Sequence, residues 1–149
     1  MTKLPLTLCV FVHIASLPAV AQIRRAEPEW TVESAPPVVV KTEPIAGSIN
    51  IDAHGTTEIR VTFSKSMLDG SWSWVKASDA TFPEKVEKPR FDHDGKTCVL
   101  PVTLQPGKTY ALWINDAKAR GFMDTRRTPA VPYLLVFQTQ SDASARKRR

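Results

Sequence analysis

The sequence predicts an all-β fold in which two antiparallel sheets pack face to face, and three observations support this prediction. Short segments of alternating polar and apolar residues recur along the chain, separated by turn residues such as Asp-Gly and Pro-Gly. No window of eleven or more residues beyond the amino-terminal segment has a convincing helical period. The chain has 149 residues and 42% hydrophobic content, which is enough for one domain with a packed core.

The first predicted strands lie between residues 38 and 63. Val38-Val39-Val40 is β-branched and bounded by prolines, which favours an edge strand. Ile49-Asn50-Ile51 alternates before a turn at His54-Gly55. In residues 58–63 the alternation is strict, so every second side chain should lie on one buried face.

Tight turns separate the later strands, which are expected at residues 71–75, 85–91 (the weakest), 96–104, 109–115 and 133–139. Asp94-Gly95 favours a hairpin because both residues tolerate a positive φ, and Gln105-Pro106-Gly107 favours a second turn. Residues 116–132 should form an irregular loop. Seven or eight short strands with turns between them are typical of a single immunoglobulin-like antiparallel β-sandwich.

Both ends of the chain are expected to lie outside this domain. Residues 1–21 have the pattern of a cleaved signal peptide, with a basic start, an apolar run and small residues at Ala19 and Ala21. The alternative interpretation is a buried amino-terminal helix. The apolar run has 12 residues, which is shorter than the ~20 residues that span a bilayer as a helix, so no transmembrane segment is expected.

These features divide the chain into four predicted parts. They are a signal peptide (1–21), a flexible leader (22–35), the β-sandwich (36–140) and a disordered basic tail (141–149). The protein is therefore expected to be exported to the periplasm, the cell envelope or the extracellular space.

Export changes the cysteine count, because Cys9 would leave with the signal peptide and only Cys98 would remain. No disulfide could then form within the chain. Cys98 lies in an apolar strand-like run, so the favoured interpretation is a small buried side chain. The alternative is a reactive thiol or an intermolecular bridge, although no neighbouring base is visible in the sequence.

The formal charge of +5 resides in the tail. Residues 22–145 carry 15 basic and 15 acidic side chains, and Arg146-Lys147-Arg148-Arg149 adds four positive charges. Such a block is usually solvated, and it could touch an anionic surface such as a membrane or an envelope polymer. No nucleic-acid partner is expected for an exported protein.

Several segments together suggest a family. Phe63-Ser64-Lys65-Ser66-Met67 resembles the F-S-x-x-M segment of SbsA-type bacterial Ig-like domains, which are named for an S-layer protein. Residues 104–110 are similar to the L-x-P-G-x-x-Y segment of that family, and residues 137–139 to its terminal F-x-T. The resemblance covers about Pro36 to Gln140 and implies an Ig-like fold without catalytic residues.

The sequence departs from the family pattern before the last strand. The family usually has a D-x-x-G turn there, but Arg127 stands where the glycine would follow Asp124. Tyr110, by contrast, fits a tyrosine corner, in which the ring enters the core and the hydroxyl bonds nearby backbone. Leu112 and Ile114 should then face inward, and Trp113 outward.

No segment predicts a reaction or a cofactor, so the protein is not expected to be an enzyme. The cluster Asp92-His93-Asp94-Gly95 offers two carboxylates for a cation such as calcium, but a structural hairpin turn is favoured because no acidic residue closes the loop downstream. His54, His93 and Cys98 lack the spacing of zinc ligands. The common catalytic and phosphate-binding motifs are missing.

The candidate ligand-binding residues are Trp72, Trp74 and Trp113. Trp72 and Trp74 alternate with serines and should share one face. If that face points inward, both are core residues, which is the commoner arrangement in Ig folds. If it points outward, the three tryptophans could form a platform for sugar or peptide.

The sequence therefore favours an exported non-catalytic Ig-like module that acts by adhesion or protein contact in the cell envelope. The alternative is a small carbohydrate- or cation-binding module. The partner, an envelope protein or a glycan, is not identified by the sequence.

Overall fold

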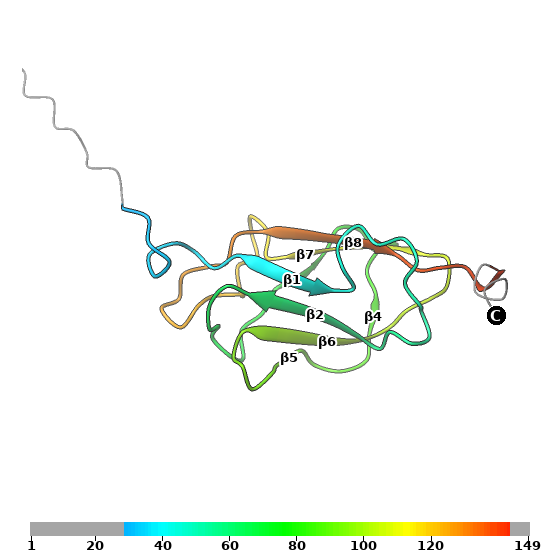
Figure 1. Ribbon diagram of the computed structural model, residues 1–149, viewed down its shortest axis with the longest axis horizontal. Helices are drawn as coiled ribbons and strands as arrows, with labels where there is room; N and C mark the ends of the chain where they lie inside the picture. The colour runs from blue at the N-terminus through cyan, green and yellow to red at the C-terminus, as the bar shows by residue number, and fades with distance from the viewer. Residues whose placement is uncertain (1–28, 144–149) are drawn as a thin grey trace, which may run out of the picture. The chain divides into compact units, whose positions relative to one another are not determined.

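A computed structural model describes residues 29–143 of the chain. The described residues from Thr31 onward belong to one unit, and the fold below is the fold of that unit (Figure 1). The predicted signal peptide, residues 22–28 of the leader and residues 144–149 of the basic tail lie outside the described residues. No helix within residues 29–143 has the length and apolar character needed to cross a membrane.

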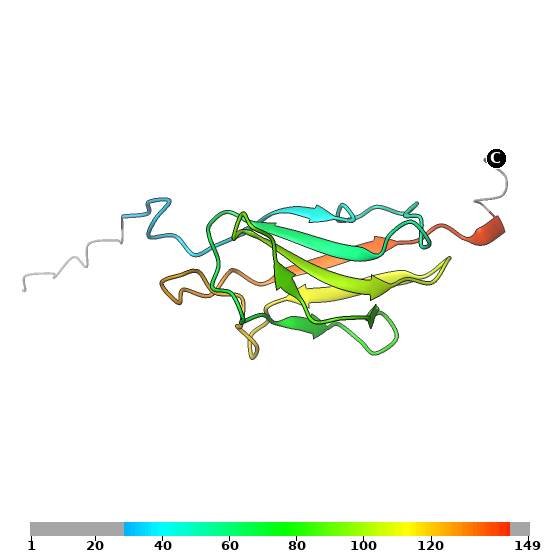
Figure 2. The same ribbon diagram turned by 90° about the horizontal axis from the view of Figure 1, so that it is seen from below.

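The described residues form two antiparallel sheets, as the sequence predicts (Figures 1 and 2). The larger sheet has the order β1-β2-β6, with β4 and β5 both paired to the far edge of β6, and the smaller sheet has the order β3-β7-β8. The strands are β1 (Val39–Glu43), β2 (Glu58–Phe63), β3 (Trp74–Lys76), β4 (Glu84–Lys85), β5 (Arg90–Phe91), β6 (Thr97–Thr103), β7 (Thr109–Ile114) and β8 (Tyr133–Gln138). The all-β sandwich is thereby confirmed.

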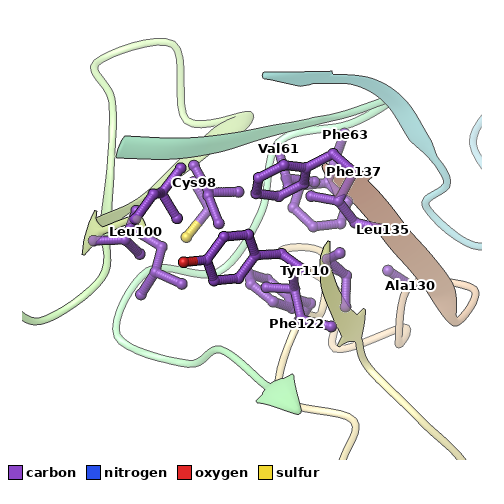
Figure 3. Packing of buried hydrophobic residues seen from close by; sticks show 14 of the residues in the cluster. Val61, Phe63, Cys98, Leu100, Tyr110, Phe122, Ala130, Leu135 and Phe137 are labelled. Atoms are coloured by element: carbon purple, nitrogen blue, oxygen red, sulfur yellow. The ribbon is translucent and has the colours of Figure 1, made fainter. Parts of the chain in front are cut away.

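Alternation along the strands places the core between the sheets. In β2 the side chains of Ile59, Val61 and Phe63 are buried, and in β7 Leu112 and Ile114 are buried with Tyr110. Figure 3 shows residues from both sheets packed against one another, with the Tyr110 ring among them. The period-two pattern in the sequence therefore identified the buried face correctly.

Tyr110 makes the corner that the sequence predicts. Its ring is fully buried and stacks on Phe137 at a centroid distance of 5.3 Å. Its hydroxyl accepts a hydrogen bond of 2.7 Å from the backbone N–H of Gln105, five residues earlier. Gly107, with φ of +68°, lets the chain reverse between these two residues. The corner fixes the turn that leads from β6 into β7.

In place of the single strand predicted at 85–91, the structure has two short strands, β4 and β5, with an interruption between them. Pro101 of β6 faces the interruption. Its carbonyl accepts a hydrogen bond of 3.1 Å from the Val86 N–H, but proline has no N–H to return the second bond of an antiparallel pair. Residues 86–89 therefore run outside the ladder before pairing resumes at Arg90.

The first predicted strands also differ from the structure. β1 begins at Val39 and runs to Glu43, with an irregularity in its pairing between Val39 and Lys41 that leaves Val40 exposed. The predicted strand at 49–51 is wrong: only Ile51 forms a single bridge, which is parallel and joins it to Thr139. A strand needs a continuous ladder, and this short segment has a partner at one point only.

Residues 47–51 nevertheless follow the outer edge of β8. The Gly47 N–H donates to the Val136 carbonyl at 2.7 Å, and the Gln138 N–H donates to the Ser48 carbonyl at 2.7 Å. The Ile51 N–H donates in turn to the Gln138 carbonyl at 3.1 Å. The segment thus supplies the last strand with hydrogen-bond partners on the side away from β7.

Residues just before the predicted domain boundary at 36 contact the sandwich as well. The ammonium group of Lys65, which follows β2, donates to the backbone carbonyls of Glu33 and Ala35. The same ammonium lies 3.9 Å from the carboxylate of Asp124 in the loop before β8. The Lys65 side chain therefore connects residues 33–35 to the end of β2 and to the loop before β8.

The loop at 116–132 is irregular, as expected, but its interior is well defined. Asn115 at the end of β7 is fully buried, with φ of +57°. Its Nδ2 donates to the carbonyls of Phe122 (2.9 Å) and Ala130 (3.1 Å), and its Oδ1 accepts from the Phe122 N–H (2.9 Å). Asparagine tolerates the left-handed conformation, so one side chain can hold both branches of the loop.

Side-chain and backbone contacts define the turn that lacks the family glycine. Asp124 is buried, and its Oδ1 accepts hydrogen bonds from the N–H groups of Arg126 (2.9 Å) and Thr128 (2.8 Å). Arg127 occupies the glycine position of the motif with φ of +66°. A non-glycine residue in this conformation carries a steric cost from its Cβ atom.

Replacing Arg127 with glycine is therefore expected to stabilise the domain by about 0.5–1 kcal/mol, since the relieved strain exceeds the extra entropy of glycine in the unfolded chain. The shift in the urea midpoint measures this gain. Arg126→Gly is the matched control, because Arg126 has no positive φ, and it should leave stability unchanged or lower it. Equal effects of the two substitutions would contradict the strain at Arg127.

Candidate binding surfaces

The three candidate tryptophans do not lie on one face. Trp74 of β3 pairs with Ile114 of β7, whereas Val75 pairs with Trp113. Since paired residues share a face of a sheet, Trp74 lies on the inner side with the buried Ile114, and Trp113 lies on the outer side. A single platform that includes Trp74 and Trp113 is therefore wrong, because strand parity separates the two side chains.

Trp74 is part of the core packing. Its ring meets Phe122 edge to face at a centroid distance of 5.4 Å, and its buried Nε1 makes no regular hydrogen bond with any described residue. Burial raises the pKa of the Cys98 thiol to about 12. The neighbouring Trp74 lowers this pKa, but by less than burial raises it. The free thiol is buried and is held protonated, in agreement with the favoured interpretation of Cys98 as a core side chain.

Trp72 is half-buried and lies in an irregular segment before β3. The predicted strand at 71–75 starts late, at Trp74, and two serine hydroxyls hold the segment before it. The hydroxyl of Ser71 donates to the Gly121 carbonyl, and the Gly121 N–H donates to the hydroxyl of Ser73, both at 2.7 Å. Trp72 packs against the edge of the core and also lines an open hollow with residues 85–89.

Trp113 belongs to an apolar outer face on the smaller sheet. The strand register places Val75, Trp113 and Leu134 in one row across the three strands. Ala111 and Val136 form the next row. Leu134 is 40% exposed and the other four side chains are half-buried. We call these five residues the Trp113 face; it contains no charged residue.

The outer face of the larger sheet has the opposite character. Arg60 of β2 pairs with Glu58 at 3.2 Å, with Glu43 of β1 at 3.7 Å and with Asp92 beside β5. Glu58 also pairs with Arg90, and hydrogen bonding to this guanidinium holds the pKa of Glu58 below its usual range. This network of five charged residues makes the outer surface of the larger sheet polar.

The Asp92–Gly95 cluster has a structural role. The carboxylate of Asp94 accepts hydrogen bonds from the Lys96 N–H, the Thr97 N–H and the Thr97 hydroxyl, all at 2.7–2.8 Å. These bonds, led by that of the hydroxyl, lower the pKa of Asp94. The predicted hairpin turn joins β5 to β6, which pair antiparallel, and of its two central residues Gly95 has the positive φ. Among residues 29–143 no group of three or more potential metal ligands comes together.

The inward-facing residues of the 116–132 loop were missed by the sequence analysis. Phe122 is fully buried and contacts the rings of Phe63, Trp74 and Phe91. Asn115 and Asp124 hold the backbone around it. Phe122 is the one aromatic residue in the sequence of this loop and was the available signal, but neither alternation nor a turn motif marked it as inward-facing.

Comparisons with known proteins agree with this architecture. The family model described as "Bacterial Ig-like domain" matches residues 33–139. A search of curated proteins found no match. Among solved structures, the chain is similar to a crystal structure of the S-layer protein rSbsC, with 21% identity and a TM-score of 0.44.

That alignment covers 70% of this chain and 14% of the S-layer protein chain. The family match is more extensive, and it includes every strand from β1 to β8. It begins at residue 33, where the contacts of Lys65 with the leader also begin. This chain belongs to the bacterial Ig-like domain family.

Proposed function

We propose that the protein is an exported, non-catalytic module that contacts a protein of the cell envelope through the Trp113 face. Family membership, the signal-like residues 1–21 and the F-S-x-x-M segment support export and the closer SbsA-type assignment. The basic tail adds a second, electrostatic contact with an anionic envelope surface.

The observation that carries the proposal is the contrast between the two outer faces. Charged side chains cover the larger sheet, while the smaller sheet presents Val75, Trp113 and Leu134 in register. Protein interfaces have this composition at their centres, where aromatic residues are enriched and charges are depleted. Trp74 cannot cover Trp113, because the two lie on opposite faces of the sheet.

Substitution of Trp113 tests the role of this face. Trp113→Ala should retain the fold and should lose most of the envelope protein captured by wild-type protein from an envelope extract. Val40→Ala is the matched control, because Val40 is 59% exposed and apolar but belongs to the larger sheet. Undiminished capture by Trp113→Ala would contradict the proposal.

The stability of the same variant gives a second readout. A loss of several kcal/mol on Trp113→Ala, as for a core residue, would make Trp113 a packing residue and would also contradict the proposal. A small loss together with lost capture supports a contact surface.

A further inference from the structure

The hollow beside Trp72 shares no residue with the Trp113 face. It has a volume of about 590 Å³ and is lined by Trp72, Lys85, Val86, Glu87, Lys88 and Pro89. One wall thus comes from the segment before β3, and the other from the segment between β4 and β5. These segments belong to the unpaired edges of the two sheets.

The two walls of the hollow, residues 86–89 and Trp72, owe their positions to different backbone features. Residues 86–89 leave the ladder because Pro101 lacks an N–H, so their side chains stand beside the sheet. On the opposite wall, the hydrogen bonds of Ser71 and Ser73 with Gly121 hold Trp72. A Cβ atom at Gly121 would lie 2.7 Å from the carbonyl carbon of Trp72, so this close approach requires glycine. The wall that carries Trp72 is therefore held in place by backbone contacts.

The side chains of the hollow combine apolar surface with positive charge. Trp72, Val86 and Pro89 supply the apolar surface, and Val86 is 59% exposed. Lys85 and Lys88 are exposed, and neither makes an ion pair with a described residue. The Lys85 ammonium lies 6.0 Å from the centroid of the Phe82 ring, at the outer limit of a cation–π contact.

A second hollow lies on the other side of residues 86–87 from part of the lining of the first hollow. It has a volume of about 420 Å³ and shares Val86 and Glu87 with its neighbour. Thr57 and Thr103 are among its lining residues and offer hydroxyl donors, whereas Arg90 in this lining is already paired with Glu58, which lines the hollow as well. The second hollow therefore adds no unpaired cation, and Lys85 and Lys88 are the cations available to a ligand.

We propose that the hollow beside Trp72 binds an acidic polysaccharide, with a sugar ring against the indole and sugar carboxylates beside Lys85 and Lys88. The indole offers a rigid apolar face to the C–H groups of a pyranose. The lysines supply charge-assisted hydrogen bonds that a neutral glycan would leave unused. Glu87 is the one carboxylate of the lining, so the hollow keeps a net positive charge.

Binding of polygalacturonate and of neutral dextran by the full chain, measured by isothermal titration calorimetry at two salt concentrations, tests the proposal. Polygalacturonate should bind more tightly than dextran, and its affinity should fall as salt increases. Trp72→Leu should weaken binding about tenfold or more. Because Trp72 also packs against the core, the double variant Lys85→Gln/Lys88→Gln gives a second test at exposed positions, and it should lose several-fold in affinity and most of the salt dependence.

Three control variants separate this site from other sources of binding. Lys96→Gln removes one exposed lysine outside the hollow and should leave affinity within about twofold, while Trp113→Ala should have no effect. A variant with Arg146, Lys147, Arg148 and Arg149 changed to glutamine tests the tail.

The proposal is overturned if wild-type protein binds neither polymer, if dextran binds equally well, or if the Lys85/Lys88 double variant binds polygalacturonate like wild type. Binding that disappears with the tail variant alone would also overturn it. Because the Trp113 face is tested by separate variants, failure here leaves the proposed protein contact open to its own test.

Discussion

Replacing Phe122 with alanine is expected to lower the free energy of unfolding by about 3–5 kcal/mol, as the loss of a buried aromatic ring does in other cores. The ring centroid lies 5.1 Å from Phe63 of β2, 5.4 Å from Trp74 of β3 and 6.4 Å from Phe91 of β5. A loop residue thus joins strands of both sheets, and its removal leaves a cavity between them.

Urea unfolding followed by circular dichroism measures this loss. Phe82→Ala is the matched control, because Phe82 is half-buried at the edge of the core and does not contact the Phe122 ring cluster. It should cost clearly less than Phe122→Ala. A Phe122→Ala variant as stable as Phe82→Ala would show that the loop does not contribute to the core.

Asn115→Ala is expected to destabilise the domain by about 3 kcal/mol, because three hydrogen bonds in a fully buried site would be lost together. The N–H of Phe122 and the carbonyl of Ala130 would lose their side-chain partner without gaining water. Alanine would also have to keep the positive φ, which its Cβ atom disfavours.

Two further variants separate these causes. Asn115→Gly removes the same hydrogen bonds but relieves the backbone, so it should be more stable than Asn115→Ala. Asp116→Ala removes a neighbouring side chain whose Oδ1 accepts from the N–H groups of Lys118 and Ala119 at a half-exposed position, and it should cost about 1 kcal/mol or less. If Asp116→Ala lowers the free energy of unfolding as much as Asn115→Ala does, the burial of Asn115 adds nothing to the contribution of its hydrogen bonds.

The strands with strict alternation could be predicted from the sequence. In β2 and β7 the period of two identified the buried side chains, and the spacing of Tyr110 from the Pro106-Gly107 turn predicted its hydrogen bond. These features are determined by residues close together in the chain, so local patterns are sufficient to find them.

The remaining features depend on partners far away in the sequence. The break between β4 and β5 follows from Pro101, which lies ten or more residues later, and the inward position of Phe122 follows from contacts with Phe63 and Phe91. For the candidate site, the spacing of Trp72 and Trp74 suggested that they share a face. Whether Trp113 lies on the same face as Trp74 could be found only from the register of β3 against β7. A shift of that register by one residue would have placed Trp74 and Trp113 on the same face of the sheet.

The hydrogen bonds of residues 47–51 with β8 also affect how the protein can associate. A strand edge with free N–H and C=O groups is a template for another strand, and a sheet with an apolar face is especially prone to growing into an aggregate. Gly47 and Ile51 donate to the backbone of β8, and Ser48 accepts from it. The opposite edge is β3, which is only three residues long. Both edges of the smaller sheet therefore oppose ribbon-like stacking of copies, so the partner proposed above would contact the side chains of the Trp113 face and would not extend the sheet.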